Sequence, residues 1–180
     1  RKSGLNVIDD FFNESALEKY KELRDIDYIF SSNSFAHISD IKSIAKAISI
    51  ALSNKGKFVV EVQSFVELVK KNAFDFVYHE HKYYYTLQSI TRLMKRFDLH
   101  LEDANLIPTH GGSYRLVFGK LQVEQSLSTR EVISREESFQ INSKNMRSAI
   151  LKYEAELEKL DKLIEILHAQ GNRIIAFGAS

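Results

Sequence analysis

Cysteine is absent from this 180-residue sequence, and proline occurs only once. Without cysteine, a disulfide-stapled fold and a thiolate zinc site are both excluded within these residues. No apolar run approaches the roughly 18 residues that span a bilayer, and no signal peptide opens the chain. The net charge of +1 gives no reason to expect nucleic acid or an anionic membrane as a partner. We therefore expect a globular cytoplasmic protein.

A glycine-rich loop of the kind that cradles a cofactor is also missing near the start, where Gly4 stands alone. The chain begins at Arg1 and stops just after a predicted buried strand at residues 174–177. Such a strand has no later segment with which to pair. We therefore expect a fragment of a longer protein, with the first strand of any Rossmann-like sheet and its cofactor loop upstream of Arg1.

Strands and helices alternate through the first half of the sequence. We predict strands at residues 5–8, 27–30 and 58–62. Asn13 and Ser39 are the expected caps of the helices between them, and residues 54–56 should end the second helix. This order predicts an α/β layer structure with parallel strands, which binds ligands at the carboxyl ends of its strands.

The second half begins with a predicted helix at residues 87–97. Two strands at 99–102 and 114–118 follow, and the short connection between them favours an antiparallel hairpin. Apolar residues between Met146 and Leu167 then alternate at spacings of four and three, a heptad pattern ended by Gly171. We expect one domain over residues 1–125 and a second part over 126–180, with 146–167 as a candidate surface for self-association.

Residues 77–85 read VYHEHKYYY and concentrate titratable and hydroxyl groups. A metal site could draw on His79, His81 and His110, but the helical zinc signature needs histidines four apart, and that spacing is absent. An acid/base site would use Glu80 to orient an imidazole ring and support its charged form. The three tyrosines at 83–85 are typical of core packing.

A second polar run, residues 109–113, also has two interpretations. It is either a glycine-rich hairpin connection or a backbone segment that approaches a ligand closely, because glycine has no side chain to block the approach. His37 lies just past a strand end, four residues after Asn33. Such a histidine is structural unless the other segments converge on it.

Four motifs together suggest a family: Asn33-Ser-Phe-Ala-His37, Tyr78-His-Glu80-His81, Thr109-His-Gly-Gly-Ser113 and Phe177-Gly-Ala-Ser180. In this order and spacing, and over almost the whole chain, the sequence resembles the S-adenosylmethionine-dependent C-methyltransferases of nucleotide-linked deoxy-keto-sugars. The resemblance implies an α/β fold, the later part of a class I methyltransferase Rossmann-like sheet with a β-hairpin. A long helix and the first strand of a second Rossmann-like domain would follow. Zinc would belong only to an amino-terminal module that this sequence lacks.

The resemblance also implies roles for individual residues. Catalytic roles fall on His37, Tyr78, Glu80 and His81. Cofactor contacts fall on Asp9, Ser32 and Asn33, and contacts to the sugar-nucleotide substrate fall on Thr109, His110, Gly111, Gly112, Ser113, Gly178 and Ser180.

Methylation of a carbon requires a carbanion equivalent, and a ketone makes the neighbouring C–H acidic enough for a side-chain base if the enolate oxygen is stabilised. In our hypothesis His81 takes this proton, Glu80 orients or polarises the site, and Tyr78 or His37 donates to the oxyanion. Two alternatives stay open. One is a non-catalytic α/β fragment that self-associates through the heptad helix, and the other is a histidine-based metal-dependent hydrolase.

Overall fold

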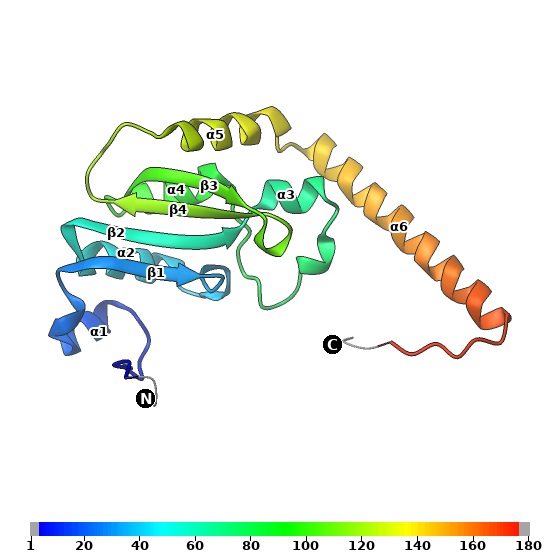
Figure 1. Ribbon diagram of the computed structural model, residues 1–180, viewed down its shortest axis with the longest axis horizontal. Coiled ribbons are helices and arrows are strands. Elements are labelled where there is room, and N and C mark those ends of the chain that lie inside the picture. Colours follow the sequence, from blue (N-terminus) through cyan, green and yellow to red (C-terminus); the bar gives the residue numbers. More distant parts are fainter. Residues whose placement is uncertain (1–3, 177–180) are drawn as a thin grey trace.

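The computed structural model describes residues 4–176, and its centre is a four-stranded sheet (Figure 1). The strands are β1 (Ile26–Ser32), β2 (Leu52–Gln63), β3 (His100–Ile107) and β4 (Ser113–Gly119), in the spatial order β1-β2-β4-β3. β1 and β2 are parallel, whereas β4 is antiparallel to both of its neighbours. The predicted parallel pair and the predicted hairpin are both confirmed.

Helices α2 (Ile41–Ala51) and α4 (Leu87–Lys95) pack their apolar faces on the sheet. The alternation of β2 turns Phe58, Val60 and Val62 toward them, and all three are fully or almost fully buried. At the outer edge, Tyr28 and Phe30 of β1 point to the opposite side and remain 63% and 71% exposed. The core therefore lies between the sheet and one layer of helices.

Shorter elements connect these layers. Helix α1 (Glu14–Lys19) begins at Asn13, whose side chain accepts a hydrogen bond from the Ala16 N–H, as predicted. Helix α3 (Phe65–Lys70) follows β2 directly and is capped by Ser64. Four 3-10 turns complete the connections: η1 (Lys21–Leu23), η2 (Phe35–His37), η3 (Phe74–Phe76) and η4 (Thr109–Gly111).

Helix α5 (Leu127–Phe139) packs against the sheet through Val132, which belongs to the main core. Glu136 holds it there, because this carboxylate accepts hydrogen bonds from the Tyr114 hydroxyl at 2.7 Å and from the Leu87 N–H at 2.6 Å. A single side chain thus joins β4, the start of α4 and α5. The packing of the sheet continues past the predicted boundary between residues 125 and 126.

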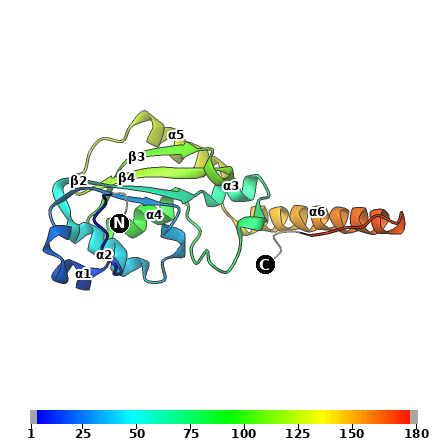
Figure 2. The same ribbon diagram turned by 60° about the horizontal axis from the view of Figure 1, so that its bottom comes forward.

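Helix α6 (Ser143–Ala169) runs away from the sheet as one long rod (Figures 1 and 2). Its beginning packs on α3, where Ala149 is buried with Leu68 and Val69. Further along, Leu157 and Leu160 of the heptad face are 43% and 51% exposed. Within the described residues, no helix combines the length and the apolar character needed to cross a membrane.

Two predicted strands are wrong as far as the structure describes them. Residues 5–8 and 174–176 are irregular, and Ile175 is 85% exposed. Neither segment lies beside a described strand that could supply hydrogen bonds, and apolar character alone does not hold an isolated strand. Phe177, the end of the second prediction, lies outside the described residues.

Two helix boundaries also need correction. Asp40, rather than Ser39, caps α2, since its carboxylate accepts from the Ser43 N–H at 3.1 Å. The predicted stop at residues 54–56 is wrong because α2 ends at Ala51 and β2 starts at the next residue. Leu52 already pairs with Ile26 of β1, and the next pair is Lys57 with Tyr28. Residues 54–56 therefore lie in an irregular part of β2 and do not form the stop of α2.

Candidate active site

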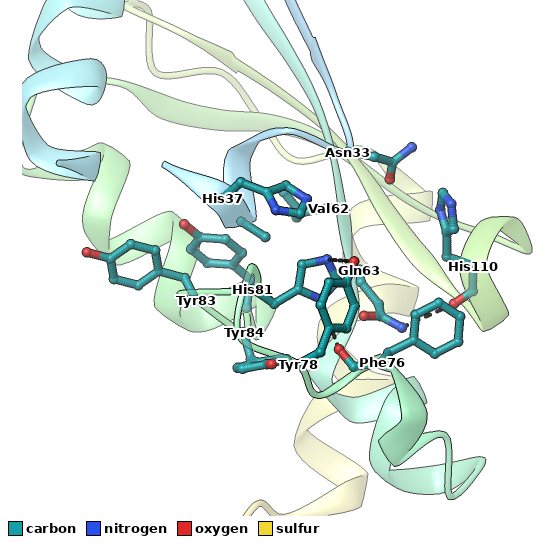
Figure 3. Close-up of a pocket in the computed structure, with 12 residues that line it drawn as sticks. Asn33, His37, Val62, Gln63, Phe76, Tyr78, His81, Tyr83, Tyr84 and His110 are labelled. Atoms are coloured by element: carbon teal, nitrogen blue, oxygen red, sulfur yellow. Dashed lines mark hydrogen bonds between the residues drawn. The ribbon is translucent and has the colours of Figure 1, made fainter. Parts of the chain in front are cut away.

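A cavity of about 130 Å³ opens at the carboxyl ends of β1 and β2, the edge predicted to bind ligands (Figure 3). It gathers residues from the turn after β1, from the end of β2, from the VYHEHKYYY segment and from the β3–β4 loop. Its lining consists of Asn33, Ala36, His37, Val62, Gln63, Phe76, Tyr78, His81, Tyr83, Tyr84, Tyr85 and His110.

His81 is fixed by two hydrogen bonds, one at each ring nitrogen. Its Nδ1 lies 3.0 Å from the Phe76 carbonyl oxygen, and its Nε2 lies 3.0 Å from the Tyr78 hydroxyl. A carbonyl oxygen can only accept, so Nδ1 carries the proton and Nε2 of the neutral ring accepts from Tyr78. The geometry therefore presents the lone pair of Nε2, the form a general base needs, to a hydroxyl in the cavity.

His37 is held in the same way. Its Nδ1 lies 3.1 Å from the Glu80 carbonyl oxygen, which again places the proton on Nδ1 and leaves Nε2 as an acceptor. The rings of His37 and His81 are 4.8 Å apart, centre to centre. The structure thus brings His37, Tyr78 and His81 together, and the condition under which His37 could be functional is met.

The Glu80 side chain does not join them. Glu80 is exposed, its carboxylate is absent from the described cavity lining, and only its carbonyl takes part in the hydrogen bonds. The expected pair of a carboxylate and an imidazole is therefore not formed here. The backbone carbonyls of Phe76 and Glu80 orient the two rings instead. The direction of a backbone carbonyl cannot be predicted from the residue types in the sequence.

The tyrosines assigned to packing also line the cavity. Tyr85 is 5% exposed, and burial raises its pKa far above the ordinary value. Burial likewise raises the pKa of Tyr84. Both phenols therefore stay protonated at neutral pH and keep their O–H groups as donors. Packing and lining are compatible roles for this segment, which the sequence presented as alternatives.

The loop at 109–113 is anchored to the end of β2 and to α3. Gln63 donates through Nε2 to the His110 carbonyl at 3.2 Å, and Lys71 donates to the Gly111 carbonyl. At Gly112, φ is 137° and a Cβ atom would lie 2.7 Å from the Glu67 Cβ. Glycine here permits a close approach to the protein's own α3.

The other residues of this loop that were predicted to contact substrate lie around Gly112. His110 lines the cavity, and the buried Ser113 hydroxyl donates to the Thr109 carbonyl at 2.9 Å. Gly111 is exposed and has open space where a side chain would be. Gly178 and Ser180, the other predicted substrate residues, lie outside the described residues.

The three residues predicted to bind the cofactor do not lie together in the structure. Asn33 lines the cavity in a left-handed conformation, with φ at 51°. Ser32 instead donates to the Glu61 carboxylate at 3.2 Å. Asp9 is exposed ahead of α1 and is not among the described lining residues.

Gln63 lines the cavity at the end of β2, a strand-end position of the kind at which such sheets bind ligands. Its Oε1 is buried and has no hydrogen-bond partner among the described residues. A buried carbonyl oxygen without a donor is costly, so this atom suits a ligand that brings a hydroxyl or ammonium group. In the described part of the chain, no three histidine or carboxylate side chains are arranged to hold a metal ion.

Residues 3–104 match the methyltransferase domain family. The C-methyltransferase NovU of Streptomyces niveus is 39% identical over 85 residues, which are 47% of this chain and 20% of that protein. The match therefore spans about a fifth of the curated relative.

The similarity to solved structures is weaker. The complex of the Haloferax volcanii Trm112 methyltransferase activator with a methyltransferase gives a TM-score of 0.46 at 13% identity, covering 55% of this chain and 56% of that chain. The protein PH0226 of Pyrococcus horikoshii gives 0.44 at 16% identity, covering 53% and 52%. The α/β character of the fold follows from the chain's own helices and sheet. Since the family match covers more than half of its residues, this chain belongs to the methyltransferase domain family.

Proposed function

We propose that the protein transfers a methyl group from S-adenosylmethionine to a carbon next to a ketone in a nucleotide-linked deoxysugar. The observation that carries this proposal is the cluster of His37, Tyr78 and His81 at the carboxyl ends of β1 and β2. Family membership supports methyl transfer, and the partial similarity to a C-methyltransferase supports carbon as the acceptor.

The two imidazoles and the phenol are suited to removing a proton from carbon. In the proposed reaction Tyr78 shifts its hydrogen bond from His81 Nε2 to the ketone oxygen of the substrate. Nε2 is then free to take the proton from the adjacent carbon, while the C–H electron pair moves into the enolate. The Phe76 carbonyl keeps its hydrogen bond to Nδ1 throughout and so supports the imidazolium that forms. Tyr78 stabilises the oxyanion, which lowers the barrier to proton removal.

The methyl donor would lie beside this cluster. Asn33, with its amide at the end of β1, and the unpartnered Oε1 of Gln63 are polar groups that fit a ligand rich in hydroxyl and amino groups. When bound, S-adenosylmethionine would supply an electrophilic methyl group: its S–CH₃ bond would break as the enolate carbon takes the methyl, and S-adenosylhomocysteine would leave with the bonding electron pair. His37, held by the Glu80 carbonyl, provides a second acceptor nitrogen facing the cavity.

Exchange of the substrate proton with solvent tests the base directly. In the intact gene product, His81→Ala should slow deuterium incorporation next to the ketone about 10²–10⁴-fold, the usual contribution of a general base. Nuclear magnetic resonance of a nucleotide-linked 4-keto-6-deoxysugar in D₂O measures this rate. His79→Ala is the matched control, because His79 is an exposed neighbour that does not line the cavity. Normal exchange in His81→Ala would remove His81 as the base.

A further inference from the structure

A second cavity, of about 400 Å³, lies between α3 and the beginning of α6 and is lined by three lysines. Lys70 and Lys71 stand at the end of α3, and Lys152 comes from α6. The other lining residues are polar and uncharged or apolar: Val69, Asn72, Phe139, Asn145, Ser148 and Ala149. None of these described lining residues carries a carboxylate, so the chemistry of the cavity is that of an anion site.

The positive charge of the cavity is only partly balanced. Lys71 Nζ lies 3.5 Å from Glu67 Oε2, but Arg135 shares the same carboxylate through a contact of 2.9 Å to Oε1. Lys70 lies over the ring of Phe139 at 5.3 Å, and the described residues give neither Lys70 nor Lys152 an ion-pair partner. Two of the three lysines that line the cavity therefore have no compensating negative charge among the described residues.

Asn72 adds a polar group that the protein leaves unused. Its Oδ1 is buried without a hydrogen-bond partner among the described residues. Rotation of the Asn72 side-chain amide by half a revolution about its Cβ–Cγ bond would put Nδ2, a hydrogen-bond donor, in the place of this oxygen. With the Ser148 hydroxyl and the lysines, the cavity then offers several donors to one anion. A phosphate group, with its multiple acceptor oxygens, matches this set.

The position of the cavity connects it to the candidate active site. The turn η3 directly follows Asn72 and Ala73, and its last residue, Phe76, lines the catalytic cavity. Lys71 also donates to the Gly111 carbonyl in the loop that carries His110. We propose that this lysine-lined cavity binds the diphosphate of a nucleotide-linked substrate whose sugar reaches the catalytic cluster. The identity of the sugar rests on the proposed function, whereas the anion site rests on the lysines.

Calorimetric titration of the intact gene product tests the site, with thymidine diphosphate and inorganic pyrophosphate as separate probes. Replacing both Lys70 and Lys152 by alanine should weaken thymidine diphosphate binding at least tenfold, because the variant loses two charge-assisted hydrogen bonds to the phosphates. Replacing both by arginine should retain most of the affinity. Lys162→Ala is the matched control, since it removes one exposed lysine of the same helix away from the cavity.

Unchanged thymidine diphosphate affinity in the double alanine variant would overturn the proposal. A loss confined to pyrophosphate would overturn the nucleotide assignment, because it would indicate a site for free phosphate. S-adenosylhomocysteine titrated into the same variants reports whether the methyl-donor site is intact. If the lysines prove necessary for thymidine diphosphate but no keto-sugar is methylated, the anion site stands and the proposed reaction fails.

Discussion

Two backbone carbonyls fix the tautomers of the two histidines in the candidate active-site cavity. The Phe76 carbonyl fixes the proton of His81 on Nδ1, and the Glu80 carbonyl does the same for His37. Both rings therefore present an unprotonated Nε2 when neutral. The resemblance assigned catalytic roles to His37, Tyr78, Glu80 and His81, and the structure places the side chains of His37, Tyr78 and His81 together. The sequence could not show which groups orient the imidazole rings. Every residue has a backbone carbonyl, and the direction of that carbonyl depends on the fold of the chain.

Two adjacent glycines in the β3–β4 loop should respond very differently to alanine. Gly111 (φ 77°) has open space around its position, so Gly111→Ala should cost only about 1 kcal/mol of backbone strain. Gly112→Ala combines strain at φ 137° with a clash against buried Glu67. We expect a loss of roughly 2–5 kcal/mol in the free energy of unfolding. Urea denaturation of both variants measures the difference, and equal costs would contradict it.

At the scale of elements, α5 is tied to the sheet by polar contacts at both ends. Near its start, Asp103 of β3 accepts hydrogen bonds from Ser126 at 2.5 Å and Ser128 at 2.8 Å. Near its end, Glu136 accepts from the Tyr114 hydroxyl. Periodicity could not reveal α5 as part of the sheet's packing, because Val132 is its one buried apolar residue. The regular apolar faces of α2 and α4 allowed the existence of both helices to be predicted, although the cap and the end of α2 were misplaced.

The Asp103 anchor should make the attachment of α5 sensitive to acid. Burial alone would raise the Asp103 pKa, but hydrogen bonds from Ser126, Ser128 and Asn105 outweigh it and lower the pKa below the ordinary 3.8. The unfolded chain then binds more protons than the folded one, so stability rises with pH. This contribution is present above pH 3.8 and is lost as the pH falls through the lowered pKa.

Urea denaturation between about pH 2 and pH 7 measures this effect. The difference in unfolding free energy between the wild type and Asp103→Asn should be largest near neutrality and shrink in acid. Asp161→Asn, a change at an exposed position on α6, is the control and should show no such trend. A difference independent of pH would show that the charge of Asp103 is not what holds α5.

At the scale of the whole molecule, α6 divides into a packed beginning and an exposed remainder. Tyr153 lies against Phe74, with ring centres 5.2 Å apart, so the heptad face is partly used within the chain. Beyond it, Leu157, Leu160 and Ile164 are 41–51% exposed. The heptad pattern predicted one long helix correctly. It could not distinguish packing within the chain from packing between chains, since both need the same apolar spacing.

Self-association through α6 remains our prediction for the exposed part of that face. Replacing Leu157 and Ile164 with glutamate should weaken any association at least tenfold, because charges would enter the apolar seam. Lys162→Glu changes charge on the same helix outside the seam and should leave association unaltered. Sedimentation equilibrium over a range of concentrations measures both. A wild-type protein that stays monomeric at every concentration would argue against this surface.

The place of β4 in the sheet has a consequence for the order of folding during synthesis. β4 is last of the four strands in the sequence, yet it lies between β2 and β3 and forms all the pairing that joins them. Until residues 113–119 leave the ribosome, β2 presents an open edge on the side that β4 will occupy. Contacts between segments so far apart in sequence form slowly, and open strand edges promote misassembly. The nascent chain should therefore depend most on chaperones during the interval before β4 emerges.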